Sequence, residues 1–182
     1  MTGFGTDHLP YGVFSVAGDR RRVGVRLEDR VIDLAAATDR PELAAPSLNA
    51  FLALGPQVWA ETRDAVAALA ESGAAPSYAL DEVTLHLPFE VADYVDFYAS
   101  LDHASNLGRI LRPDQEPLLP NWRHLPVGYH GRAGTVVASG TPVVRPCGQR
   151  KAPSDEAPTY GPSRRLDIEA ELGFVVGTPS RL

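Results

Sequence analysis

Residues 11–34 read Tyr11-Gly-Val-Phe-Ser-Val-Ala-Gly-Asp-Arg-Arg-Arg-Val-Gly-Val-Arg-Leu-Glu-Asp-Arg-Val-Ile-Asp-Leu34 and decide the class of the N-terminal fold. Three short runs, 11–16, 22–27 and 31–34, are separated by polar turn residues. Within them apolar and other residues alternate, a pattern typical of half-buried strands. The stretch therefore predicts a meander of short strands in a small barrel or sandwich.

The apolar period becomes helical after residue 47. Ser47 could cap a short helix, and Pro56 suits the first position of a longer one that ends at Gly73. Residues 83–87 then predict a strand, which Pro88 ends. We expect a domain boundary there, with an N-terminal β domain at 1–88 and the start of a second domain at 89–182.

The second part carries a helical pattern from residue 97 to 111, followed by a segment rich in Pro, Gly and aromatic residues at 113–134. Its aromatic and apolar anchors predict an ordered loop. Residues 136–145 predict a hairpin, a polar loop with Gln149, Lys151 and Asp155 follows, and residues 166–176 predict a strand. Few residues follow that last apolar run, so we expect the chain to be the N-terminal part of a longer protein.

Composition limits the function classes. The chain has 182 residues and a net charge of −6, which does not favour nucleic acid as a partner. No apolar stretch approaches the roughly 18 residues of a membrane span, and no targeting segment is evident. The one cysteine, Cys147, rules out an internal disulfide framework. We expect a cytoplasmic protein without membrane or nucleic-acid partners.

The strongest local pattern is Leu166-Asp-Ile-Glu-Ala-Glu-Leu172. Its apolar residues would face one side of a strand and Asp167, Glu169 and Glu171 the other. Neighbours on one strand face are about 7 Å apart, so two of these carboxylates could bind one hard cation such as Ca²⁺ or Mg²⁺. The alternative is a solvated strand face without a ligand.

Two further groups could carry chemistry. Asp96 and His103 lie seven residues apart, two turns if the stretch is helical, and could serve as a metal ligand and a general base. Arg112, Tyr98 and Tyr129 could bind an organic anion, because a guanidinium holds a carboxylate with two hydrogen bonds. The alternatives are a structural histidine, a surface arginine and two packed tyrosines.

Several of these motifs together resemble the fumarylacetoacetase family. The matching stretches are Leu9-Pro-Tyr-Gly-Val-Phe-Ser15, Asp93-Tyr-Val-Asp-Phe-Tyr98 through His103, Leu119-Pro-Asn-Trp-Arg-His-Leu-Pro-Val-Gly-Tyr-His-Gly-Arg132, Ser139-Gly-Thr-Pro142 and Ser163-Arg-Arg-Leu-Asp-Ile-Glu-Ala-Glu171. The long Trp-containing segment is the most specific. The strand with two glutamates is shared more widely, with acylpyruvate hydrolases, hydratases and decarboxylases.

The resemblance implies a mainly β (α+β) protein, with a small SH3-like barrel followed by the start of a mixed β-roll catalytic domain. It implies a homodimer when full length. It also implies a divalent metal, Ca²⁺ or Mg²⁺, held by Asp96, Glu169 and Glu171.

The implied reaction is hydrolysis of a carbon–carbon bond in fumarylacetoacetate, a β-diketone dicarboxylate, to fumarate and acetoacetate. This is the last step of tyrosine and phenylalanine breakdown. The resemblance implies that His103 activates water and that Tyr98, Arg112 and Tyr129 contact the substrate. Two alternatives stay open: an acylpyruvate-type hydrolase of the same superfamily, and a truncated, non-catalytic fragment that binds or assembles.

Overall fold

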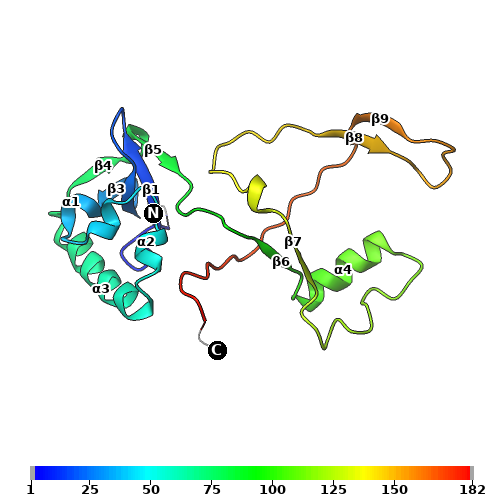
Figure 1. The fold of residues 1–182 in the computed structure, drawn as a ribbon, viewed down its shortest axis with the longest axis horizontal. Helices are drawn as coiled ribbons and strands as arrows, with labels where there is room; N and C mark the ends of the chain where they lie inside the picture. The colour runs from blue at the N-terminus through cyan, green and yellow to red at the C-terminus, as the bar shows by residue number, and fades with distance from the viewer. Residues whose placement is uncertain (1–2, 181–182) are drawn as a thin grey trace. The chain divides into compact units, whose positions relative to one another are not determined.

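The computed structural model describes residues 3–180. The chain divides into two compact units, one formed by Met1–Pro88 with Ala138–Leu182 and the other by Phe89–Val137. The fold is mixed α/β with mainly strands, and it contains a curled antiparallel sheet (Figure 1). None of the helices in residues 3–180 has the length and apolarity needed to cross a bilayer. The division into domains at residue 88 stays a prediction.

The first unit is built on a five-stranded antiparallel sheet in the order β4-β3-β2-β1-β5. Its strands are β1 (Tyr11–Val16), β2 (Arg22–Leu27), β3 (Arg30–Asp33), β4 (Ser77–Ala79) and β5 (Val83–His86). The meander predicted for residues 11–34 is confirmed by β1, β2 and β3. The register pairs Val13 with Val23 and Val25 with Ile32, which places their side chains in the core.

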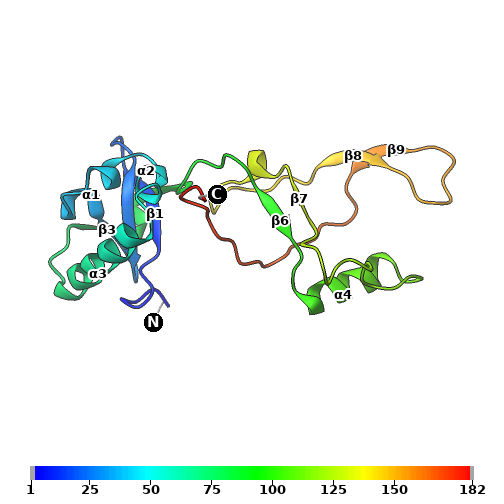
Figure 2. The same cartoon turned by 60° about the horizontal axis from the view of Figure 1, so that its bottom comes forward.

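Helix α3 (Pro56–Ser72) lies beside this sheet (Figure 2). It begins with Pro56 and ends at Gly73, whose φ of 67° is the left-handed conformation that glycine adopts readily. Both ends were predicted. Short helices connect the sheet to α3: α1 (Leu34–Ala37), η1 (Pro41–Ala44) and α2 (Asn49–Leu52), while η2 (Leu80–Glu82) joins β4 to β5.

A buried ion pair accompanies this core. The Arg22 Nε donates to Asp33 Oδ2 at 2.7 Å, and both side chains are more than nine-tenths buried. Asp33 also accepts from the Ala36 backbone N–H and so caps α1. The guanidinium carbon of Arg22 lies 4.7 Å from the centre of the Phe14 ring, so the ring packs against the flat face of the guanidinium. These contacts satisfy two charges that would otherwise be unpaired in the interior.

The second unit contains a short antiparallel pair, β6 (Val95–Phe97) with β7 (Gly128–His130), helix α4 (Leu101–Leu111) and the single turn η3 (Ala133–Thr135). Ser100 caps α4, because its hydroxyl accepts from the backbone N–H of His103. The loop between α4 and β7 contains backbone-bonded turns. The N–H of Trp122 donates to the Leu119 carbonyl, and the N–H groups of His124 and Leu125 donate to the Asn121 carbonyl. This loop was predicted to be ordered.

Three elements predicted between residues 136 and 176 differ in the structure. The hairpin at 136–145 is wrong: a turn joins the Thr141 N–H to the Ala138 carbonyl, and these residues are in no strand. Part of the predicted polar loop, around Gln149, is instead strand β8 (Cys147–Arg150), which pairs with β9 (Thr159–Pro162). The strand at 166–176 is also wrong, since those residues are assigned to no strand and pair with none. Alternating side chains favour a strand, but neighbouring backbone must complete it.

Candidate active site

Asp96 and Tyr129 meet across the β6–β7 pair. They are direct partners in the antiparallel register, so their side chains lie on the same face. The Tyr129 hydroxyl is 2.9 Å from Asp96 Oδ2, a hydrogen bond in which the phenol donates to the carboxylate. The pair thus joins a predicted metal ligand and a predicted substrate-binding residue that are far apart in sequence.

Arg132 extends this contact. Its Nη2 donates to the Tyr129 hydroxyl at 3.1 Å, and its guanidinium carbon lies 5.3 Å from the centre of the Tyr129 ring. The hydrogen bond that Arg132 donates to Tyr129 is the main cause that raises the pKa of Arg132, and the nearby Asp96 charge acts in the same direction. Arg132 therefore remains positively charged beside the Tyr129–Asp96 pair.

Gly128 permits the close approach of β6 and β7. A Cβ at this position would lie 2.5 Å from the Asp96 carbonyl oxygen and 2.6 Å from Cδ1 of Phe97. Real Cβ atoms do not approach other atoms so closely. Any larger residue would have to push the strands apart, so Gly128 sets the distance between Asp96 and Tyr129.

His103 lies in the first turn of α4 and is half-buried. Asp96, in contrast, belongs to β6. The hypothesis of one helix carrying both residues two turns apart is therefore wrong. The helix begins only at Leu101, since Ser100 has an extended backbone and caps it. The seven residues from Asp96 to His103 thus include the end of β6, the N-cap residue Ser100 and the first turn of α4.

Arg112 ends α4. Its backbone N–H donates to the Gly108 carbonyl, and its Nη2 donates to the Pro117 carbonyl at 3.0 Å. The loop folds back so closely that a Cβ at Gly108 would overlap the Pro117 carbonyl oxygen. The Arg112 Nε is buried without a hydrogen-bond partner among the residues that the structure describes. A buried donor without a partner is unfavourable.

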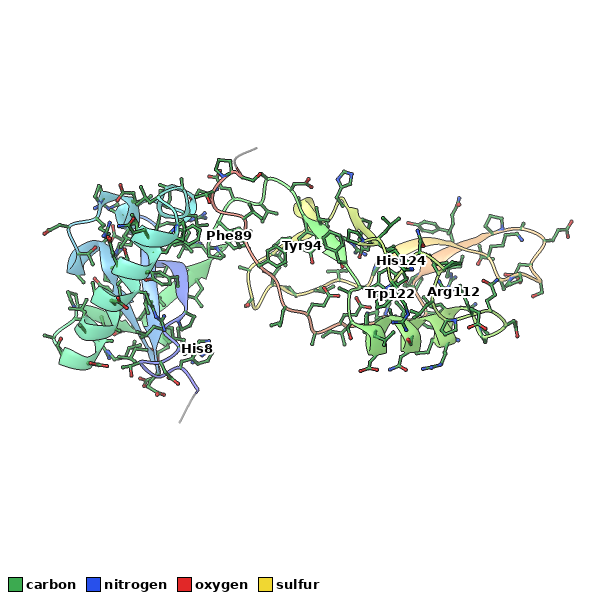
Figure 3. All side chains as sticks on the ribbon, turned by 90° about the horizontal axis from the view of Figure 1, so that it is seen from below. His8, Phe89, Tyr94, Arg112, Trp122 and His124 are labelled. Carbon is green, nitrogen blue, oxygen red and sulfur yellow. The ribbon has the colours of Figure 1, made fainter. Side chains whose placement is uncertain are left out.

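Tyr98 connects β6 to α4 and is half-buried. Its carbonyl oxygen accepts a hydrogen bond of 3.1 Å from the indole Nε1 of Trp122. Trp122 thus fixes the long loop to the segment that carries Tyr98. Figure 3 labels Trp122 and Arg112, both beside α4.

Glu169 and Glu171 lie two residues apart in a segment of the first unit without regular secondary structure, and both are exposed. Together with Asp96 they would offer carboxylate oxygens only, a donor set that suits a hard cation such as Ca²⁺ or Mg²⁺. One Asp96 oxygen is already hydrogen-bonded to Tyr129, so the other is the one suited to a cation. The three carboxylates as one ligand set stay a prediction.

Sequence reasoning missed the contributions of Arg132, Gly128 and the Trp122 indole. The roles of Arg132 and Gly128 follow from the pairing of Asp96 with Tyr129, because one contacts the Tyr129 hydroxyl and the other lies against the Asp96 carbonyl. They could therefore not be recognised before that pairing was known. Their signal was present in the run Gly128-Tyr-His-Gly-Arg132, where a small residue precedes the tyrosine and an arginine follows it by three positions.

Two family models match the chain. The model described as "Fumarylacetoacetase N-terminal" matches residues 7–88. The model described as "Fumarylacetoacetate (FAA) hydrolase C-terminal" matches residues 93–181. The two matches account for nearly the whole chain and do not overlap.

Curated relatives agree with these matches. A fumarylacetoacetase of Caenorhabditis elegans is 42% identical over 198 residues, which cover 97% of this chain and 47% of the relative. A fumarylacetoacetase of Homo sapiens is 40% identical, with 98% of this chain and 48% of the relative covered. One of Dictyostelium discoideum is 38% identical, with 97% and 47% covered. The chain spans about half the length of these relatives. Matched in both of its parts, it belongs to the fumarylacetoacetase family.

Proposed function

We propose that the protein hydrolyses the carbon–carbon bond between the two acyl parts of fumarylacetoacetate and releases fumarate and acetoacetate. The observation that carries this proposal is the hydrogen-bonded pair of Asp96 and Tyr129, in a chain whose two parts both match the family. The same unit supplies a half-buried histidine, His103, and a half-buried arginine, Arg112. A hydrolase that acts on a dicarboxylate needs such groups.

In this proposal Asp96, Glu169 and Glu171 hold a divalent cation. The family is generally metal-dependent, and an all-carboxylate donor set suits Ca²⁺ or Mg²⁺. When bound, such a cation would polarise the diketone oxygens as a Lewis acid. The role of this chain is to supply oxygen ligands and to orient at least one of them, as Tyr129 does for Asp96.

We assign proton transfer to His103. A neutral imidazole has a nitrogen that accepts a proton, so His103 can take a proton from the attacking water and return it to the leaving carbon. Breaking the bond then gives a carboxylate on one product and a protonated carbon on the other. Arg112 would bind a substrate carboxylate, with Tyr98 and Tyr129 beside the substrate.

The remaining expectations belong to this proposal. They are an SH3-like barrel for the N-terminal sheet, a β-roll for the second domain and a homodimer. We also place the reaction at the end of tyrosine and phenylalanine breakdown, in the cytoplasm. The curled antiparallel sheet is compatible with a small barrel.

The test is turnover of fumarylacetoacetate, followed by the loss of its diketone absorbance, in the intact protein isolated from its source. We expect His103→Gln to reduce kcat at least 100-fold, since general-base catalysis contributes that much. His124→Gln is the matched control, because this exposed histidine lies in the same unit outside the assigned site. Near-normal turnover by His103→Gln would refute its role. Faster turnover of an acylpyruvate would favour that substrate, and no turnover of either would favour a binding or assembly role.

A further inference from the structure

We infer that Arg132 is a positioning residue that orients the Asp96 carboxylate through the Tyr129 hydroxyl. This inference rests on the proposed function, because it treats Asp96 as a ligand of the cation. It adds a residue that neither the motif reasoning nor the family matches single out.

The direction of the two hydrogen bonds follows from the chemistry of the groups. A guanidinium can only donate, so Arg132 Nη2 donates to the Tyr129 oxygen at 3.1 Å. A phenol has a single proton, and Tyr129 lies 2.9 Å from Asp96 Oδ2, a carboxylate oxygen that can only accept. The phenol proton is therefore directed at Asp96. Because the Arg132 N–H occupies the other side of the Tyr129 oxygen, turning the phenol proton toward Arg132 would place two donors against each other and would give up the bond to Asp96.

The backbone of Arg132 is itself held in place. Its carbonyl oxygen accepts from both the N–H and the hydroxyl of Thr135, each at 3.0 Å. The preceding Gly131 has a φ of 121°, a conformation that L-residues rarely adopt. This turn directs the chain from β7 into η3 and leaves the arginine over the Tyr129 ring.

The consequence concerns the two oxygens of Asp96. Oδ2 is fixed by Tyr129, which sets the plane of the carboxylate and directs Oδ1 as the cation ligand. Partners of this kind, one contact away from a metal, typically change metal affinity by 10- to 100-fold when they are removed. A purely electrostatic role predicts the opposite sign, because removing the positive charge of Arg132 would strengthen cation binding.

The test measures Ca²⁺ binding by isothermal titration calorimetry with the full chain, and Ca²⁺ alone is the probe. We expect Arg132→Gln and Tyr129→Phe each to raise the Kd for Ca²⁺ about 10-fold. The double variant should be no weaker than the weaker single variant, because Arg132 acts through the Tyr129 hydroxyl. Arg132→Lys, which retains a charged donor, should recover part of the affinity.

Arg123→Gln is the matched control, since it removes one exposed arginine from the same unit. Unchanged or tighter Ca²⁺ binding by Arg132→Gln would overturn the inference, as would additive effects in the double variant. Asp96→Asn distinguishes the proposed ligand role of Asp96 from the proposed positioning role of Arg132. If it weakens binding while the Arg132 variants do not, only the inference fails. If it leaves binding unchanged, the proposed ligand set fails and the inference fails with it.

Discussion

Replacing Gly128 by alanine tests whether the spacing of β6 and β7 holds Asp96 beside Tyr129. The new Cβ would lie 2.5 Å from the Asp96 carbonyl oxygen, whereas ordinary contact begins at 3.4 Å. The strands would have to separate by the difference, about 0.9 Å. The obstructing atom is backbone, so no side-chain rotation can relieve the clash.

The size of the effect follows from this displacement. Inserting a methyl group into a closely packed position typically costs about 1–3 kcal/mol. If the whole separation fell on the Tyr129–Asp96 hydrogen bond, its 2.9 Å would grow to about 3.8 Å. Hydrogen bonds do not persist at such a distance. We therefore expect Gly128→Ala to weaken Ca²⁺ binding about 10-fold, as loss of the Tyr129 contact would.

Calorimetric Ca²⁺ titration and urea unfolding of the full chain would measure both effects. Gly134→Ala is the control, because a Cβ at Gly134 meets nothing within 4 Å. We expect that variant to bind and unfold like the parent chain. If Gly128→Ala also binds Ca²⁺ with unchanged affinity and loses no stability, then the spacing of β6 and β7 does not control Asp96, and the reasoning is refuted.

Three further predictions concern stability. Arg22→Met leaves the buried Asp33 carboxylate without its partner, so urea unfolding should show a free energy of unfolding lower by about 3–5 kcal/mol. Adding Asp33→Asn should restore much of that stability. An unchanged unfolding midpoint for Arg22→Met alone would count against the ion pair. Partial burial lowers the pKa of His86 below its ordinary 6.5, so the unfolded chain takes up a proton first as the pH falls. Stability should therefore decline as the pH drops below 6.5, and His86→Gln should flatten that slope; equal slopes would exclude His86 as the cause. Trp122→Phe removes the donor to the Tyr98 carbonyl and should reduce the free energy of unfolding by about 1 kcal/mol in the same assay, whereas no loss would show the bond to be unimportant.

The sequence was most informative where local signals specify the structure. Tyr11–Val16 and Arg22–Leu27 alternate and are bounded by turns, and both are strands over those residues. Pro56 and Gly73 bound α3 because one residue has a fixed φ and the other tolerates a left-handed one. Such signals depend on only a few neighbouring residues, so they can be read from the sequence without knowledge of tertiary contacts.

The candidate site was less predictable because its contacts join distant residues. Asp96 meets Tyr129 through a sequence separation of 33, and no periodicity expresses that pairing. The assumption of one helix failed since Ser100 could be read as a cap only after Leu101 was known to begin α4. The same applies to residues 166–176, where alternation describes side chains but cannot supply the neighbouring strand that a sheet needs.

The exposed apolar side chains of residues 166–176 have a practical consequence for handling the protein. Ile168 is 92% exposed and Phe174 86%, in a stretch that otherwise has the composition of aggregation-prone strands. Glu169 and Glu171 interrupt it with like charges, which discourage copies of the chain from stacking on one another. We therefore expect the two glutamates proposed as cation ligands also to oppose aggregation of the chain. Neutralising either one calls for a solubility measurement beside every binding curve, so that precipitation is not mistaken for lost affinity.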